Sequence, residues 1–462
     1  MSSNHGNADF WVVKLDASDS ILWQKCLGGS GADGANSIIQ TTGGGFAVAG
    51  YTSSNDNNVS GNHGGFSDAW VVKINDSGTI QWQKCFGGSN QDAAESIIQT
   101  SDGGFAIAGL TESLDDEVSG NHGNGDAWVV KLNDTGAIQW QKCLGGTGFD
   151  IATSIIQTAD SGFAVVGYTQ SNNDEVSGNH GGQFDVWVVK LNDTGKIIWQ
   201  KCLGGSGDDE AYSIIQSADG GYVIAGYTNS SDGDVSGNHG GYDAWVVKLN
   251  DTGTIQWQKC LGGSQTDEAY SIIQTLDSGY AVAGYTRSND GDVSGNYGNG
   301  DEWVIKLRVN GTIQWQKCLG GSQYDQAYSI IQISYGKYAV AGITASNDSN
   351  VSGNHGGEDM WIAELSPTPS YVTPDAGASG DINLEQSVPN PTTGGAEIGY
   401  SVDRDLQVKM ELYDILGKRL MTLQNPQIVT SGRHTVSIAA GDLPSGKYIY
   451  TLRAGDVVCP KK

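Results

Sequence analysis

One pattern of apolar and polar positions recurs about every 58 residues from the N-terminus to Leu365. Within each copy, four short runs rich in β-branched and aromatic residues are separated by Gly, Asp and Asn, which is typical of strands joined by turns. In the second copy these runs are Ser96–Thr100, Phe105–Thr111, Ala127–Asn133 and Ala137–Leu144. No copy has the spacing of an amphipathic helix, so the pattern predicts an all-β repeat.

Two short motifs mark the register of the copies. The run Trp-Gln-Lys-Cys ends at Cys26, Cys85, Cys143, Cys202, Cys260 and Cys318. The motif Asp-x-Trp recurs at Trp11, Trp70, Trp128, Trp187, Trp245, Trp303 and Trp361. Four antiparallel strands per copy are typical of a β-propeller blade, although short blades span only roughly 40 to 50 residues. A long polar loop between the second and third strands, such as Glu112–Asp126, accounts for the extra length.

The number of blades depends on how the ring closes. A six-bladed ring forms if Ile21–Leu27 pairs with Met360–Leu365, and Phe10–Asp16 is then a redundant strand. Because the chain also begins inside a repeat, we expect an N-terminally incomplete protein whose full form has seven blades. A linear β-solenoid is the alternative, and the propeller is favoured because a closed ring hides both sheet edges.

The charge of the chain is strongly acidic. It carries 25 basic and 52 acidic residues, a net charge of −27. Nine acidic and nine basic residues follow Gly380, so the whole excess lies in the repeats. Such a field disfavours nucleic acid and anionic membranes and favours cations and neutral polyols, although an acidic surface also serves solubility alone. No apolar run approaches the roughly 20 residues of a transmembrane helix.

Cysteine and histidine each recur about once per repeat. Equivalent cysteines in successive blades lie too far apart for the roughly 6 Å Cα separation of a disulfide, so we expect free, buried thiols. One histidine per blade cannot gather several ligands around a metal, so a structural hydrogen bond is the favoured role. These histidines are His63, His122, His180, His239 and His355, and Tyr297 replaces the sixth histidine.

A second domain follows the repeats. The propeller is predicted over residues 1–365, a linker rich in Pro, Ser, Thr and Gly over Ser366–Gly380, and a small domain over residues 381–462. Alternating runs predict strands at Glu397–Val402, Gln407–Tyr413, His434–Ala439 and Tyr448–Ala454, the pattern of a small antiparallel β-sandwich.

Three ordered motifs in this domain carry a family resemblance: Leu384–Pro391, Leu412–Lys418 and Leu443–Tyr448. They resemble the type A C-terminal sorting domain of type IX secretion cargo in Bacteroidota. The residues that carry the motifs are Pro389, Asn390, Pro391, Asp414, Gly417 and Gly446. The repeats similarly resemble propeller repeats on large surface proteins of the same bacteria, a group with no single biochemical activity.

The resemblance implies export through the outer-membrane type IX translocon. The expected location is therefore the cell surface or the exterior of a Gram-negative bacterium, with the sorting domain usually cleaved on release or surface attachment. Such cargo carries an N-terminal signal peptide, which Met1–Phe10 does not resemble, and this again favours a missing N-terminal segment.

The long loops contain candidate calcium ligands. In two loops, oxygen-bearing side chains occupy positions 1, 3, 5 and 12, with glycine at position 6 of the fifth loop, which is the spacing of an EF-hand calcium loop. These residues are Asp232, Asp234, Ser236 and Asp243, then Asp290, Asp292, Ser294 and Asp301. The same residue types build Asx-turns in any exposed loop, so calcium is one of two interpretations.

A second candidate site lies between successive blades. One aspartate per blade follows Gly-Gly-Ser or Gly-Gly-Thr, and aromatic residues vary beside it. A face that mixes carboxylates with aromatic rings suits sugars, although the recurring tyrosines also fit plain packing. The candidate ligand-binding residues are Asp150, Asp209, Asp267, Asp325, Tyr212, Tyr270 and Tyr324.

Catalysis is the rival class of function. A propeller enzyme must break its own repeat with unlike groups that converge, and the breaks at Tyr335–Lys337 and Arg308–Asn310 fall at hairpin turns instead. We therefore expect a non-enzymatic binding or adhesion module. A propeller enzyme acting on polysaccharide and an inert spacer within a larger adhesin are the alternatives.

Overall fold

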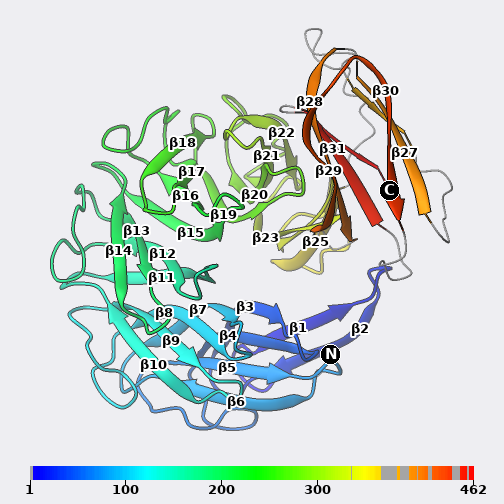
Figure 1. Cartoon of the computed structure of the whole chain (residues 1–462). Coiled ribbons are helices and arrows are strands. Elements are labelled where there is room, and N and C mark those ends of the chain that lie inside the picture. The colour runs from blue at the N-terminus through cyan, green and yellow to red at the C-terminus, as the bar shows by residue number, and fades with distance from the viewer. Residues whose placement is uncertain are drawn as a thin grey trace. The chain divides into compact units, whose positions relative to one another are not determined.

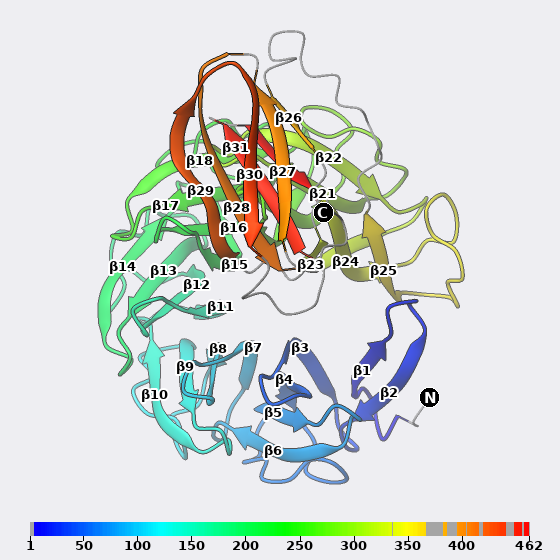
Figure 2. The same cartoon turned by 45° about the vertical axis from the view of Figure 1, so that its right-hand side comes forward.

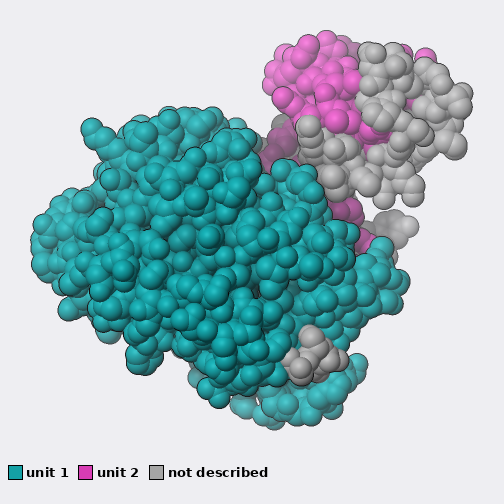
Figure 3. Space-filling view, turned by 90° about the horizontal axis from the view of Figure 1, so that it is seen from below, with its two compact units in different colours: residues 1–274, 280–329, 342–361 teal, residues 275–279, 330–341, 362–462 magenta. Residues whose placement is uncertain are grey.

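The computed structural model describes residues 4–334, 336–365, 382–385, 395–402, 404–414, 419–439, 448–454 and 457–461. Every regular element within these ranges is a β-strand, and none of the described residues forms a helix able to cross a membrane. The chain divides into two compact units, coloured separately in Figure 3: residues 1–274, 280–329 and 342–361, and residues 275–279, 330–341 and 362–462. The predicted linker Ser366–Gly380 lies outside the described residues.

Five four-stranded antiparallel sheets form the complete blades of an all-β propeller fold. Blade A contains β3 (Asp33–Gln40), β4 (Phe46–Thr52), β5 (Asp68–Ile74) and β6 (Ile80–Phe86). Blade B contains β7 (Asp92–Gln99), β8 (Phe105–Thr111), β9 (Asp126–Leu132) and β10 (Ile138–Leu144). Blade C contains β11 (Asp150–Gln157), β12 (Phe163–Thr169), β13 (Asp185–Leu191) and β14 (Ile197–Leu203). Blade D contains β15 (Asp209–Gln216), β16 (Tyr222–Thr228), β17 (Asp243–Leu249) and β18 (Ile255–Leu261), and blade E contains β19 (Asp267–Gln274), β20 (Tyr280–Thr286), β21 (Asp301–Leu307) and β22 (Ile313–Leu319).

The first strand of each blade lies innermost and the fourth lies outermost (Figure 1, Figure 2). Two incomplete sheets flank the complete blades in the sequence. One consists of β1 (Phe10–Leu15) and β2 (Ile21–Leu27), which correspond to the third and fourth strands of a repeat. The other, blade F, consists of β23 (Asp325–Ser334), β24 (Lys337–Thr344) and β25 (Asp359–Leu365).

The predicted pairing of Ile21–Leu27 with Met360–Leu365 is wrong. Strand β2 pairs antiparallel with β1, in the register that joins third and fourth strands in the complete blades. A strand joined to its partner by a short turn closes a small loop, whereas pairing with β25 closes a loop of most of the chain at a larger entropic cost. Phe10–Asp16 is therefore not redundant, because it supplies the partner of β2.

The predicted strands of the second copy are confirmed to within one residue at each end, except at the start of β7. This strand begins at Asp92 and not at Ser96, because Asp92, Ala93 and Ala94 pair with Thr111, Leu110 and Gly109. The register shifts between Ala94 and Ser96, which leaves one extra residue at a β-bulge. The bulge breaks the alternation that a sequence pattern detects, so the first half of the strand was missed.

The core of the propeller lies between neighbouring blades. One face of blade D presents Val223, Ala225, Ala244 and Val246, which share a core cluster with residues of blade E. Blade E contributes larger side chains to this cluster, among them Ile272, Tyr280, Val282 and Trp303. Small side chains on one face thus receive large side chains from the next, and this complementarity recurs at the junctions between blades A, B, C and D.

The C-terminal unit contains two further sheets. One has the order β26 (Ile382–Leu384), β27 (Gly395–Val402) and β30 (Gly432–Ala439), and the other has the order β29 (Arg419–Val429), β28 (Leu406–Asp414), β31 (Tyr448–Ala454) and β32 (Val457–Lys461). The core cluster draws on both sheets, with Ile398 and Tyr400 from one and Met410 and Leu452 from the other. This is the predicted antiparallel sandwich, and β26, β29 and β32 were not predicted.

We expect the same isoleucine-to-alanine change to have different effects in different blades. Ile272 is 2% exposed, whereas Ile38 at the same repeat position is 52% exposed. Ile272→Ala should lower the free energy of unfolding by about 2–5 kcal/mol because it leaves a cavity in the core between blades D and E. Ile38→Ala should cost less than about 1 kcal/mol in the same denaturant titration. Equal losses would contradict the asymmetry between the blades.

Candidate functional site

The aspartate between successive blades is buried and hydrogen-bonded to the loop before its blade. We call this set the junction aspartates: Asp33, Asp92, Asp150, Asp209, Asp267 and Asp325. The carboxylate of Asp267 accepts hydrogen bonds from the Thr286 hydroxyl, from the Ser288 hydroxyl at 2.8 Å and from the Gly263 amide at 2.7 Å. Equivalent hydroxyl and amide donors bind Asp150, Asp209 and Asp325. All four predicted ligand-binding aspartates are fully buried, so their carboxylates hold the loop before each blade and face no open surface.

A second buried carboxylate belongs to the Asp-x-Trp motif. Asp68 is fully buried, and His63 binds its Oδ2 through both the backbone amide at 3.0 Å and Nδ1 at 2.6 Å. On its other side, Nε2 of His63 lies 3.1 Å from the Glu117 carboxylate in the next blade. The predicted structural hydrogen bond of the repeat histidines is therefore confirmed. The Nδ1 contact recurs at His122, His180, His239 and His355.

Burial of these aspartates favours their protonated form. It raises the pKa of the Asp68, Asp126, Asp185 and Asp243 carboxyls to about 6. The pKa of Asp301 rises to about 7, because Tyr297 replaces the histidine there and only its backbone amide binds the carboxylate. Burial alone would lower the pKa of His63, but the Asp68 hydrogen bond and the Glu117 carboxylate outweigh it, so this pKa is raised.

The candidate calcium ligands point to different partners. Oδ1 of Asp232 accepts the Ser206 amide at 2.7 Å, and Oδ1 of Asp290 accepts the Ser264 amide at 2.8 Å. The hydroxyls of Ser236 and Ser294 accept hydrogen bonds from Gln258 and Gln316 at 2.6 and 2.7 Å. Asp243 and Asp301 are buried behind the loops, Asp234 lies 3.7 Å from His180, and Asp292 lines a groove with His239. No three His, Cys, Asp or Glu side chains in the described part of the chain are arranged to hold a metal ion.

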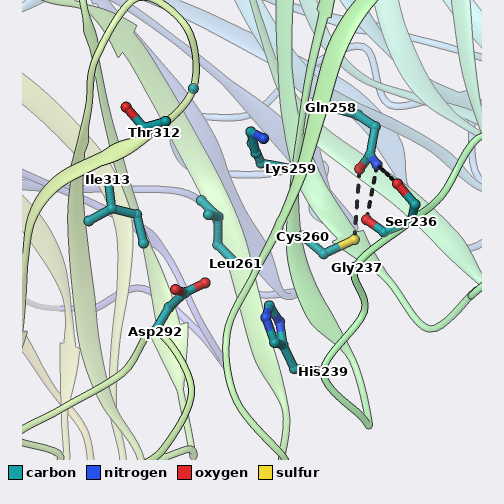
Figure 4. Close-up of a pocket in the computed structure, with 11 residues that line it drawn as sticks. Ser236, Gly237, His239, Gln258, Lys259, Cys260, Leu261, Asp292, Thr312 and Ile313 are labelled. Atoms are coloured by element: carbon teal, nitrogen blue, oxygen red, sulfur yellow. Dashed lines mark hydrogen bonds between the residues drawn. The ribbon is translucent and has the colours of Figure 1, made fainter.

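The groove beside Asp292 lies between the outer strands of blades D and E (Figure 4). It has a volume of about 470 Å³, and a similar groove recurs one blade earlier beside Asp234. Cys260 lines it, and burial raises the pKa of this thiol to about 12, so the sulfur remains a protonated, unreactive packing group. Cys85, Cys143, Cys202 and Cys318 share this burial and this shift, and Cys26 is half-buried.

The bulge of each inner strand presents one side chain that varies between blades. The register shift leaves Tyr212 unpaired in β15 and Tyr270 unpaired in β19. Opposite the bulge stands a glycine, because a Cβ at Gly284 would lie 1.9 Å from the Glu268 carbonyl oxygen. Bulges commonly redirect side chains beside functional sites. The equivalent residues in the earlier blades are Asn36, Glu95 and Thr153, and Tyr328 occupies this place in β23.

These bulge tyrosines lie in a row of neighbouring aromatic rings. The rings of Tyr212 and Tyr270 lie 5.1 Å apart between centroids, and those of Tyr270 and Tyr328 lie 5.5 Å apart. Tyr324 packs against Tyr285 at 5.0 Å. We define the tyrosine rim as Tyr212, Tyr227, Tyr242, Tyr270, Tyr324 and Tyr328. Tyr324 joins it through Gln326, whose Oε1 accepts from the hydroxyls of both Tyr324 and Tyr328, and Tyr285 is buried. All three predicted tyrosines thus belong to the rim, which lies on blades D, E and F, and Tyr168 of blade C approaches Tyr212 to 6.4 Å between ring centroids.

Carboxylates and amides accompany the rim. The Tyr212 hydroxyl donates to Glu210 at 2.7 Å, and that of Tyr270 donates to Glu268. In the next blade the Tyr328 hydroxyl donates to Gln326 at 3.0 Å. Burial raises the pKa of Glu210 and of Glu268, and the hydrogen bonds from the two tyrosine hydroxyls offset part of this rise because they favour the ionised carboxylate. The rim therefore offers aromatic faces edged by polar acceptors.

Glu302 is the functional candidate that the sequence reasoning missed. It occupies the position of Ala69, Ala127, Val186 and Ala244 and is fully buried, and neither of its carboxylate oxygens has a hydrogen-bond partner among the described residues. Burial, with Asp325 and Asp301 nearby, raises its pKa to about 8. Its Oε1 lies beside Gly342, where a Cβ would approach within 2.7 Å. Alignment of the third strands reveals this break, because glutamate replaces a small apolar residue.

The sorting motif lies mostly outside the described residues. This applies to Pro389, Asn390, Pro391, Gly417 and Gly446, whereas Asp414 ends β28. Residues 388–462 match the family model of the secretion system C-terminal sorting domain. The protein is therefore secreted or displayed at the cell surface, and this domain interacts with the type IX secretion machinery.

Other similarities are more distant. The regulatory protein FlaEY of Caulobacter vibrioides is 24% identical over 262 residues, which are 55% of this chain and 26% of FlaEY. The match thus spans about a quarter of that relative. Sqt1 from Chaetomium thermophilum has a TM-score of 0.37 at 13% identity, with 80% of this chain and 81% of that chain covered. A GH43_12 protein from a capybara gut metagenome has a TM-score of 0.31 at 12% identity, with 90% of this chain and 84% of that chain covered. At such scores neither structure informs function.

Glu302 should make the fold less stable as the pH rises. Its pKa is about 8 in the folded chain against an ordinary 4.5, so the unfolded chain releases the proton first and stability is lost between those pH values. Glu302→Ala should raise the free energy of unfolding at pH 8.5 by about 3 kcal/mol and change it little at pH 4.5. Denaturant titrations at both pH values test this, with Glu302→Gln as the variant that cannot ionise. A wild-type difference between the two pH values that Glu302→Gln leaves unchanged would assign the effect to the buried aspartates.

The calcium interpretation has its own test. Bound calcium at 100 times its dissociation constant would add about 2.7 kcal/mol per site to the stability of the folded chain. Because the loop oxygens are already hydrogen-bonded and diverge, we expect the same melting temperature in excess calcium and in chelator. A clear calcium-dependent rise that Asp290→Asn reduces would instead establish a metal site in the fifth loop.

Proposed function

We propose that this protein is an exported carbohydrate-binding propeller of a Bacteroidota cell surface, and that the tyrosine rim is its binding surface. The rim carries the proposal because it joins neighbouring aromatic rings to polar acceptors. Sugars present apolar ring faces and hydroxyls, which are complementary to such a surface. Tyr328 is 49% exposed, so at least one rim ring is open to a ligand.

The distribution of the rim supports binding by selected blades and not by all of them. The residue at this repeat position is aromatic in blades D, E and F and is Asn36, Glu95 or Thr153 in the earlier ones. A repeat that served only packing would not need this difference, since the surrounding strands keep the same register. We infer that one side of the inner rim is specialised.

The role is adhesion or capture and not catalysis. Glu210 and Glu268 occupy the same repeat position, and each accepts the hydroxyl of the tyrosine two residues later. Glycoside hydrolysis requires two carboxyl groups in unlike environments, one as acid and one as base or nucleophile. Equivalent carboxylates in equivalent hydrogen bonds support binding. A polysaccharide-cleaving enzyme and an inert spacer remain the alternatives.

A glycan array probed with the full chain tests the proposal. We expect saturable binding to a subset of neutral glycans, and Tyr328→Ala should weaken it about two- to tenfold, because stacking on an aromatic ring contributes roughly 0.5–1.5 kcal/mol. Tyr328→Phe should retain most of the affinity. Phe66→Ala is the matched control, because Phe66 is a 79% exposed aromatic residue in a loop of blade A.

The alternatives give different results in this experiment. Release of reducing sugar from a bound polysaccharide would favour the enzyme. No binding to any glycan class would leave the propeller as a spacer. Equal losses for Tyr328→Ala and Phe66→Ala would place the site away from the rim.

A further inference from the structure

Three further aromatic residues in blade C lie beside the tyrosine rim. The ring of Tyr168 in β12 lies 6.4 Å from that of Tyr212 and 4.9 Å from that of Phe184, measured between ring centroids. Phe184 in turn lies 6.4 Å from Phe149. We call Phe149, Tyr168 and Phe184 the blade C aromatics. All three are half-buried, so part of each residue remains accessible to solvent.

The backbone at two of these positions has the same structural role in every complete blade. The carbonyl oxygen of Phe184 accepts a hydrogen bond from the amide of the next junction aspartate at 2.8 Å, and that of Phe149 accepts one from the Gln170 amide at 2.9 Å. In blade A the equivalent carbonyl oxygens of Ser67 and Ala32 accept the equivalent hydrogen bonds at 2.7 and 2.9 Å. Because only the backbone is needed, the fold does not require an aromatic side chain at either position.

The side chains in this region differ between blades in a consistent pattern. Four repeat positions supply them, represented in blade D by Asp208, Tyr212, Tyr227 and Tyr242. Three of the four are aromatic in blades C and D, two in blades E and F, one in blade A and none in blade B. The tryptophans of the Asp-x-Trp motif, which serve packing, are instead present and buried in all five complete blades. The pattern therefore indicates a surface specialised on blades C to F, and not a packing requirement of the repeat.

Polar acceptors continue across the boundary between blades C and D. The Asp208 carboxylate accepts the Gln183 amide at 2.9 Å, in the loop that carries Phe184, and the Tyr242 hydroxyl lies 3.5 Å from it. Together with Glu210, this aspartate makes the surface acidic, which disfavours anionic glycans. The blade C aromatics thus have the same chemical surroundings as the tyrosine rim.

We propose that the ligand is an extended, neutral polysaccharide chain that binds along the tyrosine rim and continues onto the blade C aromatics. This inference rests on the proposed carbohydrate-binding function. A polysaccharide presents a succession of sugar rings, each with an apolar face and hydroxyls, so one chain contacts several neighbouring aromatic rings at once. Each further contact forms within a chain that is already bound, so the affinity rises with chain length. A short sugar uses only part of this row of rings.

Titration calorimetry on the full chain tests the length of the site. The probes are disaccharides and hexasaccharides of the cello-, malto-, xylo- and manno-oligosaccharide series. We expect the hexasaccharide of the recognised series to bind at least about tenfold more tightly than its disaccharide. Phe184→Ala should weaken hexasaccharide binding about two- to tenfold and leave disaccharide binding on the tyrosine rim unchanged.

Matched variants separate binding from folding. Phe184→Tyr should retain most of the hexasaccharide affinity, since Tyr242 occupies the equivalent position in blade D. Phe66→Ala should leave both affinities unchanged, because this 79% exposed ring lies in the equivalent loop of blade A. Phe149→Ala provides a second variant of the blade C aromatics, and the melting temperature of every variant shows whether it is folded.

The outcomes distinguish the length of the site from carbohydrate binding itself. Equal affinities for the two lengths would overturn the extended site while leaving carbohydrate binding in place. Equal losses for both lengths in Phe184→Ala would place a single short site on blade C and would also overturn it. Unchanged hexasaccharide affinity in folded Phe184→Ala and Phe149→Ala would do the same. No binding at either length, together with no binding on the glycan array, would overturn the proposed function.

Discussion

The hydrogen bonds of the junction aspartates are the constraint on which the rest of the propeller depends. Each carboxylate joins the glycine loop that enters a blade, the start of the inner strand and the exit of the second strand. The geometry leaves no space for a side chain on the loop, because a Cβ at Gly87 would approach Oδ2 of Asp92 to 2.3 Å. The carboxylate is fully buried, so loss of one donor would leave an unpaired charge in a medium that solvates it poorly. These hydrogen bonds therefore fix where the long loops begin, and with them the position of the tyrosine rim.

Many of the acidic side chains are buried in hydrogen bonds of this kind. Two aspartates per complete blade are buried within the junctions. One is held by hydroxyls and amides, and the other is held by a histidine in blades A to D and by the Tyr297 amide in blade E. A count of acidic residues therefore overstates the charge available to an external cation. It also explains why acidic loop spacing alone predicted calcium ligands that the structure distributes over separate hydrogen bonds. Coordination requires oxygens that converge, and convergence depends on backbone directions that spacing does not encode.

The repeat period and the strand boundaries could be predicted because each depends on local patterns. Phe105–Thr111 matches β8 and Tyr448–Ala454 matches β31. Of the residues predicted to form a binding face, Tyr212 and Tyr270 lie side by side and Tyr324 packs against Tyr285, whereas the predicted aspartates are buried. Whether a polar residue at a strand start faces solvent depends on donors 19 and 21 residues later, and only the folded blade brings those together. The bulge likewise could not be predicted, because it interrupts the alternation from which a strand is recognised.

The repeats also provide internal comparisons that a single domain lacks. The junction aspartate is present in every blade, and the hydrogen bonds from its threonine and serine donors account for it. Where one blade departs, the departure requires a local cause. Glu302 replaces a small core residue without gaining a hydrogen bond, and the rim tyrosines replace Asn36, Glu95 and Thr153 at an unchanged bulge. Ile38 is the opposite case. Isoleucine occupies this position in every blade, but it is exposed in blade A and buried in the others. A residue that differs from its counterparts in the other blades therefore points to specialised chemistry. A residue that is the same but differs in burial points to a difference in the strands that cover it. The two cases call for different experiments.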